Sequence, residues 1–424
     1  MSEPTTSYHL ERAWVDGEVR DDVRVEIAGG RFTAVTPEST PSPEATRLDG
    51  LTIPGLANAH SHAFHRALRG RTQRGRGTFW TWRDQMYDVA ARLDPDTYRE
   101  LATAVYREMV AAGYTSVGEF HYLHHRPDGT PYDAPNAMRE ALVEAAAEAR
   151  IRICLLDTGY LSSGFGAPPE GVQRRYSDGT AARWAERAGA GPAAIHSVRA
   201  VPREDLATFR GRTPLHVHLS EQVAENEACV AAYGVTPTRL LHDEGLLGPH
   251  TTVVHATHLT DADIALLGAT RTNVCLTPTT ERDLADGIGP GRRLQDAGAR
   301  LSIGSDSHAI IDPFEELRGL EMDERLATQQ RGHWTAAELM SIGTAHDVLG
   351  FDDAGAIAVG RRADLVTIDT ATPRTAGTGA DEHTAVFAAT GADVVSVVSG
   401  GVPVERDPGR LGHDLDQIIG RILT

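Results

Sequence analysis

Short runs of alternating apolar and polar residues occupy both ends of the chain. Residues 23–27 and 31–35 alternate in this way, and glycines and prolines separate such runs over the first fifty residues. A similar texture returns at 355–360, 363–368 and 394–401. Alternation is typical of strands with one buried face. We therefore predict a small β-sandwich domain built from residues 1–53 and 355–424, with a helix at its C-terminal end.

Between these ends, longer apolar runs recur and finish in polar residues. Segments with a helical pattern, such as 96–112 and 136–149, separate them. The runs cover residues 51–62, 115–122, 151–160, 193–201, 214–221, 251–258, 272–278 and 300–308. Eight such strands are the number that a (β/α)8 barrel needs, and barrel enzymes carry their active sites at the C-terminal strand ends. The sequence thus predicts an α/β fold with a barrel over residues 54–354.

The bulk composition agrees with a folded protein outside the membrane. The chain has 424 residues, of which 41% are hydrophobic, and its mean hydropathy is −0.30. No apolar run approaches the roughly 18 residues of a membrane span. The first residues have neither a basic start nor an apolar core, so we expect no secretory signal and a cytoplasmic location.

The net charge narrows the choice of partners. A formal charge of −18 disfavours nucleic acid and anionic membranes, which both reward basic surfaces. An acidic small molecule remains compatible, because screening over about 8 Å lets a local arginine cluster outweigh distant charge.

Cysteine and lysine are informative through what they exclude. The three cysteines, Cys154, Cys229 and Cys275, share no metal-like spacing, and we assign them no chemistry. The sequence contains no lysine, so all 41 basic residues are arginine. A Schiff base, a lysine general base and a carbamylated lysine bridging two metals are therefore excluded.

Histidines at two strand ends, with one aspartate, suggest a metal site. His60 and His62 alternate with a serine, so both imidazoles point to the same side of the strand. His218 ends the fifth run and is the expected third ligand, whereas His216 is expected to pack deeper in the barrel. Asp306 follows the eighth run. The alternatives are ordinary strand histidines and, for the aspartate, a helix cap.

These four residues, His60, His62, His218 and Asp306, suit one Zn²⁺ per subunit, with iron or manganese as the alternatives. His255 ends the sixth run, and we expect it to hold or polarise the nucleophilic water. A structural hydrogen-bonding histidine is its alternative. Glu221 follows His218 by three residues and is the candidate that carries a proton to a departing nitrogen. The alternative for Glu221 is an acidic residue in the first turn of the next helix.

Together these residues resemble the amidohydrolase superfamily over nearly the whole chain. The resemblance includes the split small domain and the segment Gly-Arg-Arg-Ala-Asp-Leu-Val at 360–366. Within the superfamily, the absence of lysine points to the branch with a single metal ion, which contains many deaminases and deiminases.

Three further segments resemble the deiminases that act on N-formimino-L-glutamate. They are Thr-Phe-Trp-Thr-Trp-Arg at 78–83, Gly-Glu-Phe-His-Tyr-Leu-His-His at 118–125 and His-Ser-Val-Arg-Ala-Val at 196–201. The resemblance implies that Arg83, Tyr122, His196 and Arg199 bind the two substrate carboxylates, with Arg83 in its own or a neighbouring subunit. For the two arginines the alternative is an ion pair unrelated to substrate, on a long loop in the case of Arg83.

One position departs from this pattern. His65 stands where members of the family carry glutamine. A histidine ring N–H replaces the amide as a donor to a carboxylate, so we keep His65 among the substrate-binding residues, with an altered pH dependence.

The expected activity is a zinc-dependent deiminase that hydrolyses N-formimino-L-glutamate to N-formyl-L-glutamate and ammonia in histidine degradation. In this hypothesis His255 and Asp306 hold the attacking water, Asp306 receives its proton, and Glu221 protonates the nitrogen. We also expect a homodimer. The rivals are another single-metal deaminase, acting on a purine, pyrimidine or triazine, and a catalytically inactive barrel that serves as a scaffold.

Overall fold

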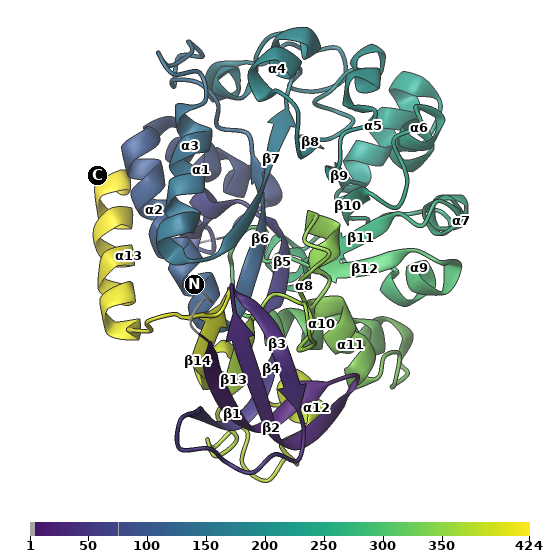
Figure 1. Ribbon diagram of the computed structural model, residues 1–424. Coiled ribbons are helices and arrows are strands. Elements are labelled where there is room, and N and C mark those ends of the chain that lie inside the picture. Colours follow the sequence, from purple (N-terminus) through teal and green to yellow (C-terminus); the bar gives the residue numbers. More distant parts are fainter. Residues whose placement is uncertain (1–4, 75) are drawn as a thin grey trace.

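Two bodies make up the molecule in the computed structural model (Figure 1), which describes residues 5–74 and 76–424. A barrel with surrounding helices forms the larger body, and a sheet from both ends of the chain forms the smaller one. Residues 1–4, which contribute to the expectation about a secretory signal, lie outside the described residues.

The barrel contains eight parallel strands in the order of the sequence. They are β5 (Leu56–Ser61), β6 (Tyr114–His121), β7 (Arg152–Gly159), β8 (Ala193–Ile195), β9 (Leu215–Leu219), β10 (Thr251–His255), β11 (Asn273–Leu276) and β12 (Arg300–Ile303). The end of the last strand is joined to the first strand: the backbone N–H of Asp306 donates to the carbonyl of His60 at 3.0 Å. The predicted (β/α)8 barrel is confirmed.

Helices follow the strands and cover the outside of the barrel (Figure 1). The α-helices are α1 (Phe79–Arg92), α2 (Pro95–Ala112), α3 (Ala137–Ala149), α4 (Ala181–Ala188), α5 (Val223–Tyr233), α6 (Pro237–Asp243), α7 (Asp261–Ala269), α8 (Pro278–Leu284), α9 (Gly291–Ala297), α10 (Pro313–Thr328), α11 (Ala336–Gly343), α12 (Glu382–Phe387) and α13 (Pro408–Leu423). The 3-10 turns are η1 (Ala63–Leu68), η2 (Gly171–Tyr176), η3 (Arg203–Phe209), η4 (His346–Leu349) and η5 (Gly391–Asp393).

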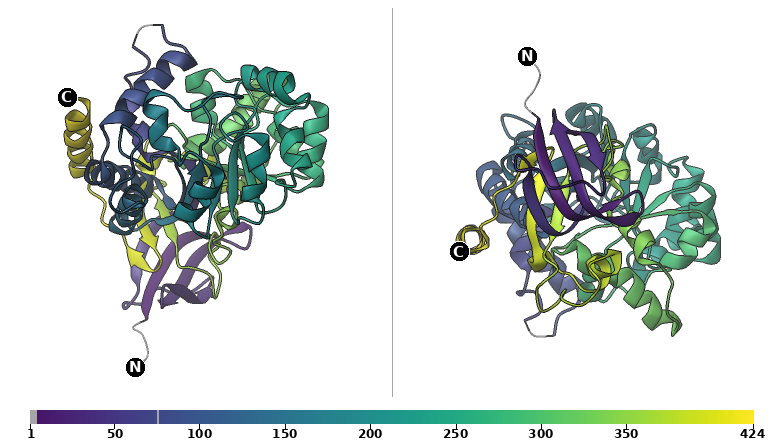
Figure 2. Two further views of the ribbon diagram at one scale, coloured as in Figure 1. Left: turned by 90° about the horizontal axis from the view of Figure 1, so that it is seen from above. Right: turned by 60° about the horizontal axis from the view of Figure 1, so that its bottom comes forward.

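The small domain is one seven-stranded sheet, ordered β15-β14-β13-β4-β1-β2-β3. Its strands are β1 (Thr6–Val15), β2 (Glu18–Ala28), β3 (Arg31–Thr36), β4 (Thr46–Pro54), β13 (Leu365–Ile368), β14 (Val394–Ser399) and β15 (Val402–Pro403). The two ends of the chain meet where β13 pairs antiparallel with β4, and Figure 2 shows these strands side by side. The prediction that both ends build one small β domain is confirmed.

Two predicted strands differ from the structure. The run 51–62 is divided by Gly55, so that β4 belongs to the small sheet and only β5 to the barrel. A Cβ at Gly55 would lie 2.2 Å from Oγ1 of Thr115, so this close crossing between the two bodies requires glycine. Residues 355–360 form turns instead of a strand, because Gly355 and Gly360 take positive φ angles of 83° and 84°.

The C-terminal helix follows the small domain in the chain but packs on the barrel in space. Leu415, Ile418 and Ile422 of α13 are buried in the same apolar core as the barrel helices, and Nη1 of Arg92 in α1 donates to the carbonyl of Ile422 at 3.2 Å. Figure 1 shows α13 alongside α2. No helix in the described part of the chain has both the length and the apolar character needed to cross a membrane.

Candidate functional site

Four predicted ligand residues converge at the C-terminal end of the barrel. His60 lies on β5 and His62 directly follows that strand, His218 lies on β9, and Asp306 follows β12. Nε2 of His218 lies 3.1 Å from Nε2 of His60 and 3.3 Å from that of His62. Oδ1 of Asp306 lies 3.1 Å from Nε2 of His60 and 3.4 Å from Nε2 of His62. All four residues are buried.

These separations fit a tetrahedral zinc ion. Donors at about 2.0–2.1 Å from a zinc ion, at the corners of a tetrahedron, lie about 3.3 Å from one another. Burial lowers the pKa of His60, His62 and His218, so the three imidazoles are neutral and present lone pairs. Three converging lone pairs and a carboxylate repel one another without a cation between them. The donor set therefore fits zinc.

Backbone carbonyls orient two of the imidazoles. Nδ1 of His62 donates to the carbonyl of Phe120 at 3.0 Å, and Nδ1 of His218 donates to the carbonyl of His196 at 2.8 Å. A proton held on Nδ1 leaves the Nε2 lone pair for a metal. Both rings are thus fixed in the tautomer that ligation requires.

The turns that carry His255 and Asp306 adopt unusual backbone conformations. His255 and Asp306 have positive φ angles of 70° and 39°, a region that residues with side chains seldom occupy. Such conformations persist where the surrounding structure imposes them, and they cluster at functional sites. Asp306 does not cap a helix, because the next helix begins with Asp312 as its cap.

His255 lies among three carboxylates beside the ligands. Its Nε2 is 3.9 Å from Oε1 of Glu221 and 3.9 Å from Oδ2 of Asp306, and its Nδ1 is 3.8 Å from Oε1 of Glu281. Burial alone would lower the pKa of His255, but these carboxylates raise it to about 10. The three neighbouring carboxyl groups thus favour the protonated form of this imidazole, which donates hydrogen bonds.

The pKa values of the two carboxyl groups facing His255 are shifted in opposite directions. Burial raises the pKa of Glu221, which favours its acid form. Burial alone would also raise the pKa of Asp306, but His60 and His255 hold it well below its usual range. Glu221 precedes the cap residue Gln222 of α5, so it does not belong to the first helical turn.

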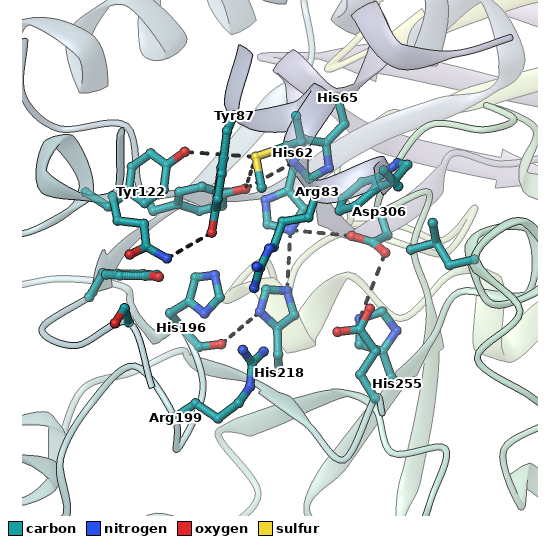
Figure 3. A pocket seen from close by; sticks show the side chains of 18 residues that line it. His62, His65, Arg83, Tyr87, Tyr122, His196, Arg199, His218, His255 and Asp306 are labelled. Carbon is teal, nitrogen blue, oxygen red and sulfur yellow. Dashed lines mark hydrogen bonds and ion pairs between the residues drawn. The ribbon is translucent and has the colours of Figure 1, made fainter. Parts of the chain in front are cut away.

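A single pocket joins these groups to the residues expected to bind substrate (Figure 3). The space between its walls, including the open mouth, is about 710 Å³. The pocket is lined by His62, His65, Trp82, Arg83, Met86, Tyr87, Tyr122, Tyr160, Ser163, Gln173, Tyr176, His196, Arg199, His218, Glu221, His255, Leu284 and Asp306. The structure thus brings the predicted catalytic and substrate-binding residues together.

Both predicted arginines enter this pocket. Arg83 lies on α1, not on a loop, and its guanidinium carbon lies 5.6 Å from the centre of the Tyr87 ring. It lines the pocket of its own chain. The Nε group of Arg199 donates to Oε2 of the buried Glu225 at 3.2 Å. In Figure 3, both arginines point into the pocket.

The other three predicted substrate residues form the wall near the metal ligands. Nε2 of His65 lies 3.1 Å from the hydroxyl oxygen of Tyr122, and the His196 ring lies edge-on to Tyr122 at 5.4 Å between centroids. Burial lowers the pKa of His65 and of His196 to about 3 each. Both rings are therefore neutral, and each offers one N–H donor.

Several residues that line the pocket, or that hold a residue lining it, had no assigned role in the sequence. Tyr160 directly follows β7 and carried a signal, since it stands last in the run 151–160. Gln173 and Tyr176 come from η2, and Gln173 donates through Nε2 to the hydroxyl of Tyr87 at 3.0 Å. Glu225 is the acid in the first turn of α5. No strand or motif marked these last residues.

Other histidines near the site face elsewhere. His216 is buried on β9, and its Nε2 lies 3.4 Å from the carbonyl oxygen of Val348, as expected for packing deeper in the barrel. His124 and His125, from the segment 118–125, are buried, and Nε2 of His125 lies 3.1 Å from Oδ1 of Asp178. The three cysteines are buried and free.

Comparison with known proteins gives one matching family and relatives named as deaminating enzymes. A family model described as "Amidohydrolase family" matches residues 51–404. The formimidoylglutamate deiminase of Pseudomonas aeruginosa is 35% identical in an alignment covering 97% of this chain and 98% of that protein. A 5-methylthioadenosine/S-adenosylhomocysteine deaminase of Haloarcula marismortui is 30% identical, over 92% of this chain and 89% of that protein.

The solved structures include an amidohydrolase from Brucella melitensis with a TM-score of 0.91 and 30% identity. The alignment covers 99% of this chain and 100% of that one. The similarity therefore extends over both the barrel and the small sheet.

The two histidines of β9 provide a matched test of the metal site. We expect the wild-type chain to retain about one zinc ion, as the tetrahedral donor set at the end of the barrel implies, and His218→Ala to lose most of it. His216→Ala removes another buried histidine of the same strand, which contacts the carbonyl oxygen of Val348 and is not one of the four converging residues. Elemental analysis after desalting measures the metal content. Equal zinc loss in both variants would contradict the assignment of His218.

Proposed function

Because this chain belongs to the amidohydrolase family, we propose that it is a zinc-dependent deiminase that hydrolyses N-formimino-L-glutamate to N-formyl-L-glutamate and ammonia in histidine degradation. The observation that carries the proposal is a pocket with opposite charges in two places. Glu221 and Asp306 lie beside the metal ligands, and Arg83 and Arg199 line the same pocket. The substrate has a matching polarity, since it joins a cationic amidine to two carboxylates.

The metal in this proposal is one Zn²⁺ held by His60, His62, His218 and Asp306, with iron or manganese as alternatives. When bound, zinc lowers the pKa of a coordinated water from 15.7 to about 7 and so supplies a nucleophile at neutral pH.

The remaining proton transfers use the groups around His255. Oε1 of Glu221 and Oδ2 of Asp306 each lie 3.9 Å from Nε2 of His255, so both carboxyl groups flank the same ring nitrogen. In the proposed reaction His255 and Asp306 orient the water, and Asp306 accepts its proton as the oxygen attacks the formimino carbon. Glu221 then protonates the amino nitrogen and takes back the proton of the new hydroxyl group, so that the C=O bond forms as the C–N bond breaks and ammonia leaves. The raised pKa of Glu221 suits a proton donor.

The substrate carboxylates are assigned to the arginine side of the pocket. Nε of Arg199 is occupied by Glu225, so its terminal amino groups are the donors directed at the substrate. A guanidinium presents such donors as a planar fork that matches a carboxylate. Arg83, Tyr122 and His196 complete this binding surface, and His65 contributes a ring N–H in place of the family's glutamine amide.

A purine deaminase is the second candidate. The Haloarcula marismortui relative is named for deamination of 5-methylthioadenosine and S-adenosylhomocysteine, and the aromatic side chains of Tyr122, Tyr160 and Tyr176 offer faces for a base. A neutral base does not require two arginines in the pocket, which is why we favour the dicarboxylate. An inactive scaffold is disfavoured, because all four ligand residues are present.

The proposal also covers the setting of the enzyme. It assigns the hydrolase to residues 54–354, between the two parts of the small domain, and describes a cytoplasmic homodimer. Arg83 lines the pocket of its own chain, so the proposed site does not need a residue from the second subunit.

Substrate choice is tested by ammonia release. We expect rapid release from N-formimino-L-glutamate and slower release from N-formimino-L-aspartate, whose carboxylates lie one methylene closer together. Guanine, cytosine, adenosine and 5-methylthioadenosine are expected to be inactive, because they lack carboxylates for the arginines. A coupled ammonia assay gives kcat/KM for each compound. Preferred turnover of a purine would favour the second candidate.

Glu221→Gln tests the proton donor. The amide keeps the size of the side chain but cannot deliver a proton, so kcat should fall by about 10²- to 10⁴-fold with a much smaller change in KM. Zinc content is expected to stay at the wild-type level, because Glu221 is not one of the four converging residues. Near-normal turnover by the amide variant would remove Glu221 from this role.

Arg83→Ala and Arg199→Ala test recognition of the carboxylates. Each substitution removes charged hydrogen bonds worth about 1.5–3 kcal/mol, so kcat/KM should fall by about 10- to 100-fold or more. Arg203→Ala is the control, because Arg203 pairs with Glu244 and does not line the pocket. If both pocket variants kept wild-type kcat/KM on formiminoglutamate, the assigned carboxylate contacts would be wrong.

A further inference from the structure

A buried glutamate with no role in the proposed reaction lies behind the metal ligands. Glu119 belongs to β6, next to β5, and its side chain is fully buried. Its Oε1 accepts the backbone N–H of Ala63 at 2.7 Å, and its Oε2 accepts the hydroxyl of Ser61 at 2.7 Å. The two donors are the residues immediately before and after His62. The carboxylate therefore holds the backbone on both sides of a metal ligand.

The same contact extends to the turn after β12. Oγ of Ser61 lies 3.1 Å from Nε2 of His308. Since the single proton of the serine hydroxyl is donated to Glu119, the histidine donates its Nε2–H to the serine oxygen. His308 stands two residues after Asp306, and its own backbone carbonyl accepts Nε of Arg69 at 2.7 Å. A chain of hydrogen bonds thus runs from Glu119 to the turn that carries the fourth ligand.

This chain crosses the weakest join of the barrel. The eight-stranded sheet runs from β5 to β12 through adjacent paired strands, and its two ends meet through an isolated bridge between Ser61 and Asp306. His60 and His62 lie on one side of this join, and Asp306 lies on the other. Asp306 and His308 also take positive φ angles of 39° and 56°, which a free turn would not favour.

We propose that Glu119 is a positioning residue for the metal site: its carboxylate fixes the end of β5 and, through Ser61, the turn that carries Asp306. Tetrahedral ligation needs donors at fixed separations, and a shift of a few tenths of an ångström across the join lengthens a metal bond. Glu119 touches neither metal nor substrate. It acts through the residues that flank the ligands.

Glu119→Gln is the principal test. The amide keeps the side-chain size but offers one acceptor in place of two, so it cannot accept from both Ala63 and Ser61. We expect the dissociation constant for zinc to rise by about 10- to 100-fold, the usual effect of losing a partner that orients metal ligands. Competition with a fluorescent chelator measures this constant on the full chain without any substrate.

Glu321→Gln is the matched control. Glu321 is also a fully buried glutamate, and it accepts the backbone N–H groups of Gly332 and Trp334 far along the chain from the ligands. Its replacement should lower the thermal unfolding temperature without changing zinc affinity. If Glu119→Gln and Glu321→Gln retain zinc equally well, Glu119 serves the stability of the barrel alone and the proposal is overturned.

Ser61→Ala provides a second variant in case Glu119→Gln does not fold. It removes the link to His308 but leaves the bond from Ala63 to Glu119, so zinc affinity should fall by a smaller factor. Unchanged affinity would overturn the proposed link.

The inference rests on the metal part of the proposed function and not on the substrate. A wild-type chain that binds no zinc would refute the metal site itself, whereas equal binding by wild type and variants would refute only the role of Glu119.

Discussion

The structure depends on one electrostatic constraint, which is the meeting of three neutral imidazole nitrogens and a carboxylate oxygen at separations of 3.1 to 3.4 Å. Such a group is unfavourable unless a cation shares its lone pairs, and it needs strand ends that are held still. The barrel supplies that rigidity, because β5, β9 and β12 are parts of one closed sheet. Carbonyls of neighbouring strands then select the ring tautomers of His62 and His218. The separations between the ligand atoms are therefore kept only while the barrel holds these strand ends together.

Pairs of opposite charge surround the metal ligands and the far side of the pocket. His255 is surrounded by Glu221, Glu281 and Asp306, and these carboxyl groups raise its pKa despite burial. On the other side of the pocket, Glu225 holds Arg199 by its Nε group. In both places a buried charge has a fixed partner of opposite sign, which reduces the cost of burial and sets the direction in which the remaining donors point. The pocket thus carries groups of both signs of charge at fixed places.

The sequence predicted the parts of this arrangement that follow from strand periodicity. His60 and His62 alternate on one strand, His218 and Asp306 follow apolar runs, and all four meet because parallel strands end at the same rim. The sequence did not show where β4 ends and β5 begins, since Gly55 is needed for a contact with Thr115 that only the folded chain reveals. The alternative for Arg83, an ion pair on a long loop, also missed a helix: α1 begins at Phe79, after a capping box between Thr78 and Thr81.

The residues that the sequence left without a role share a physical reason. Gln173 and Tyr176 reach the pocket from η2, and Glu225 of α5 acts behind it by pairing with Arg199; contacts between distant segments orient these elements, and no local pattern does. The net charge of −18 was equally incomplete as a guide. It describes the field far from the surface, which salt screens over about 8 Å. Inside a pocket, a ligand responds to the groups within that distance, and two arginines there outweigh an acidic surface. For an anionic substrate, the position of charge therefore decides binding, and its total does not.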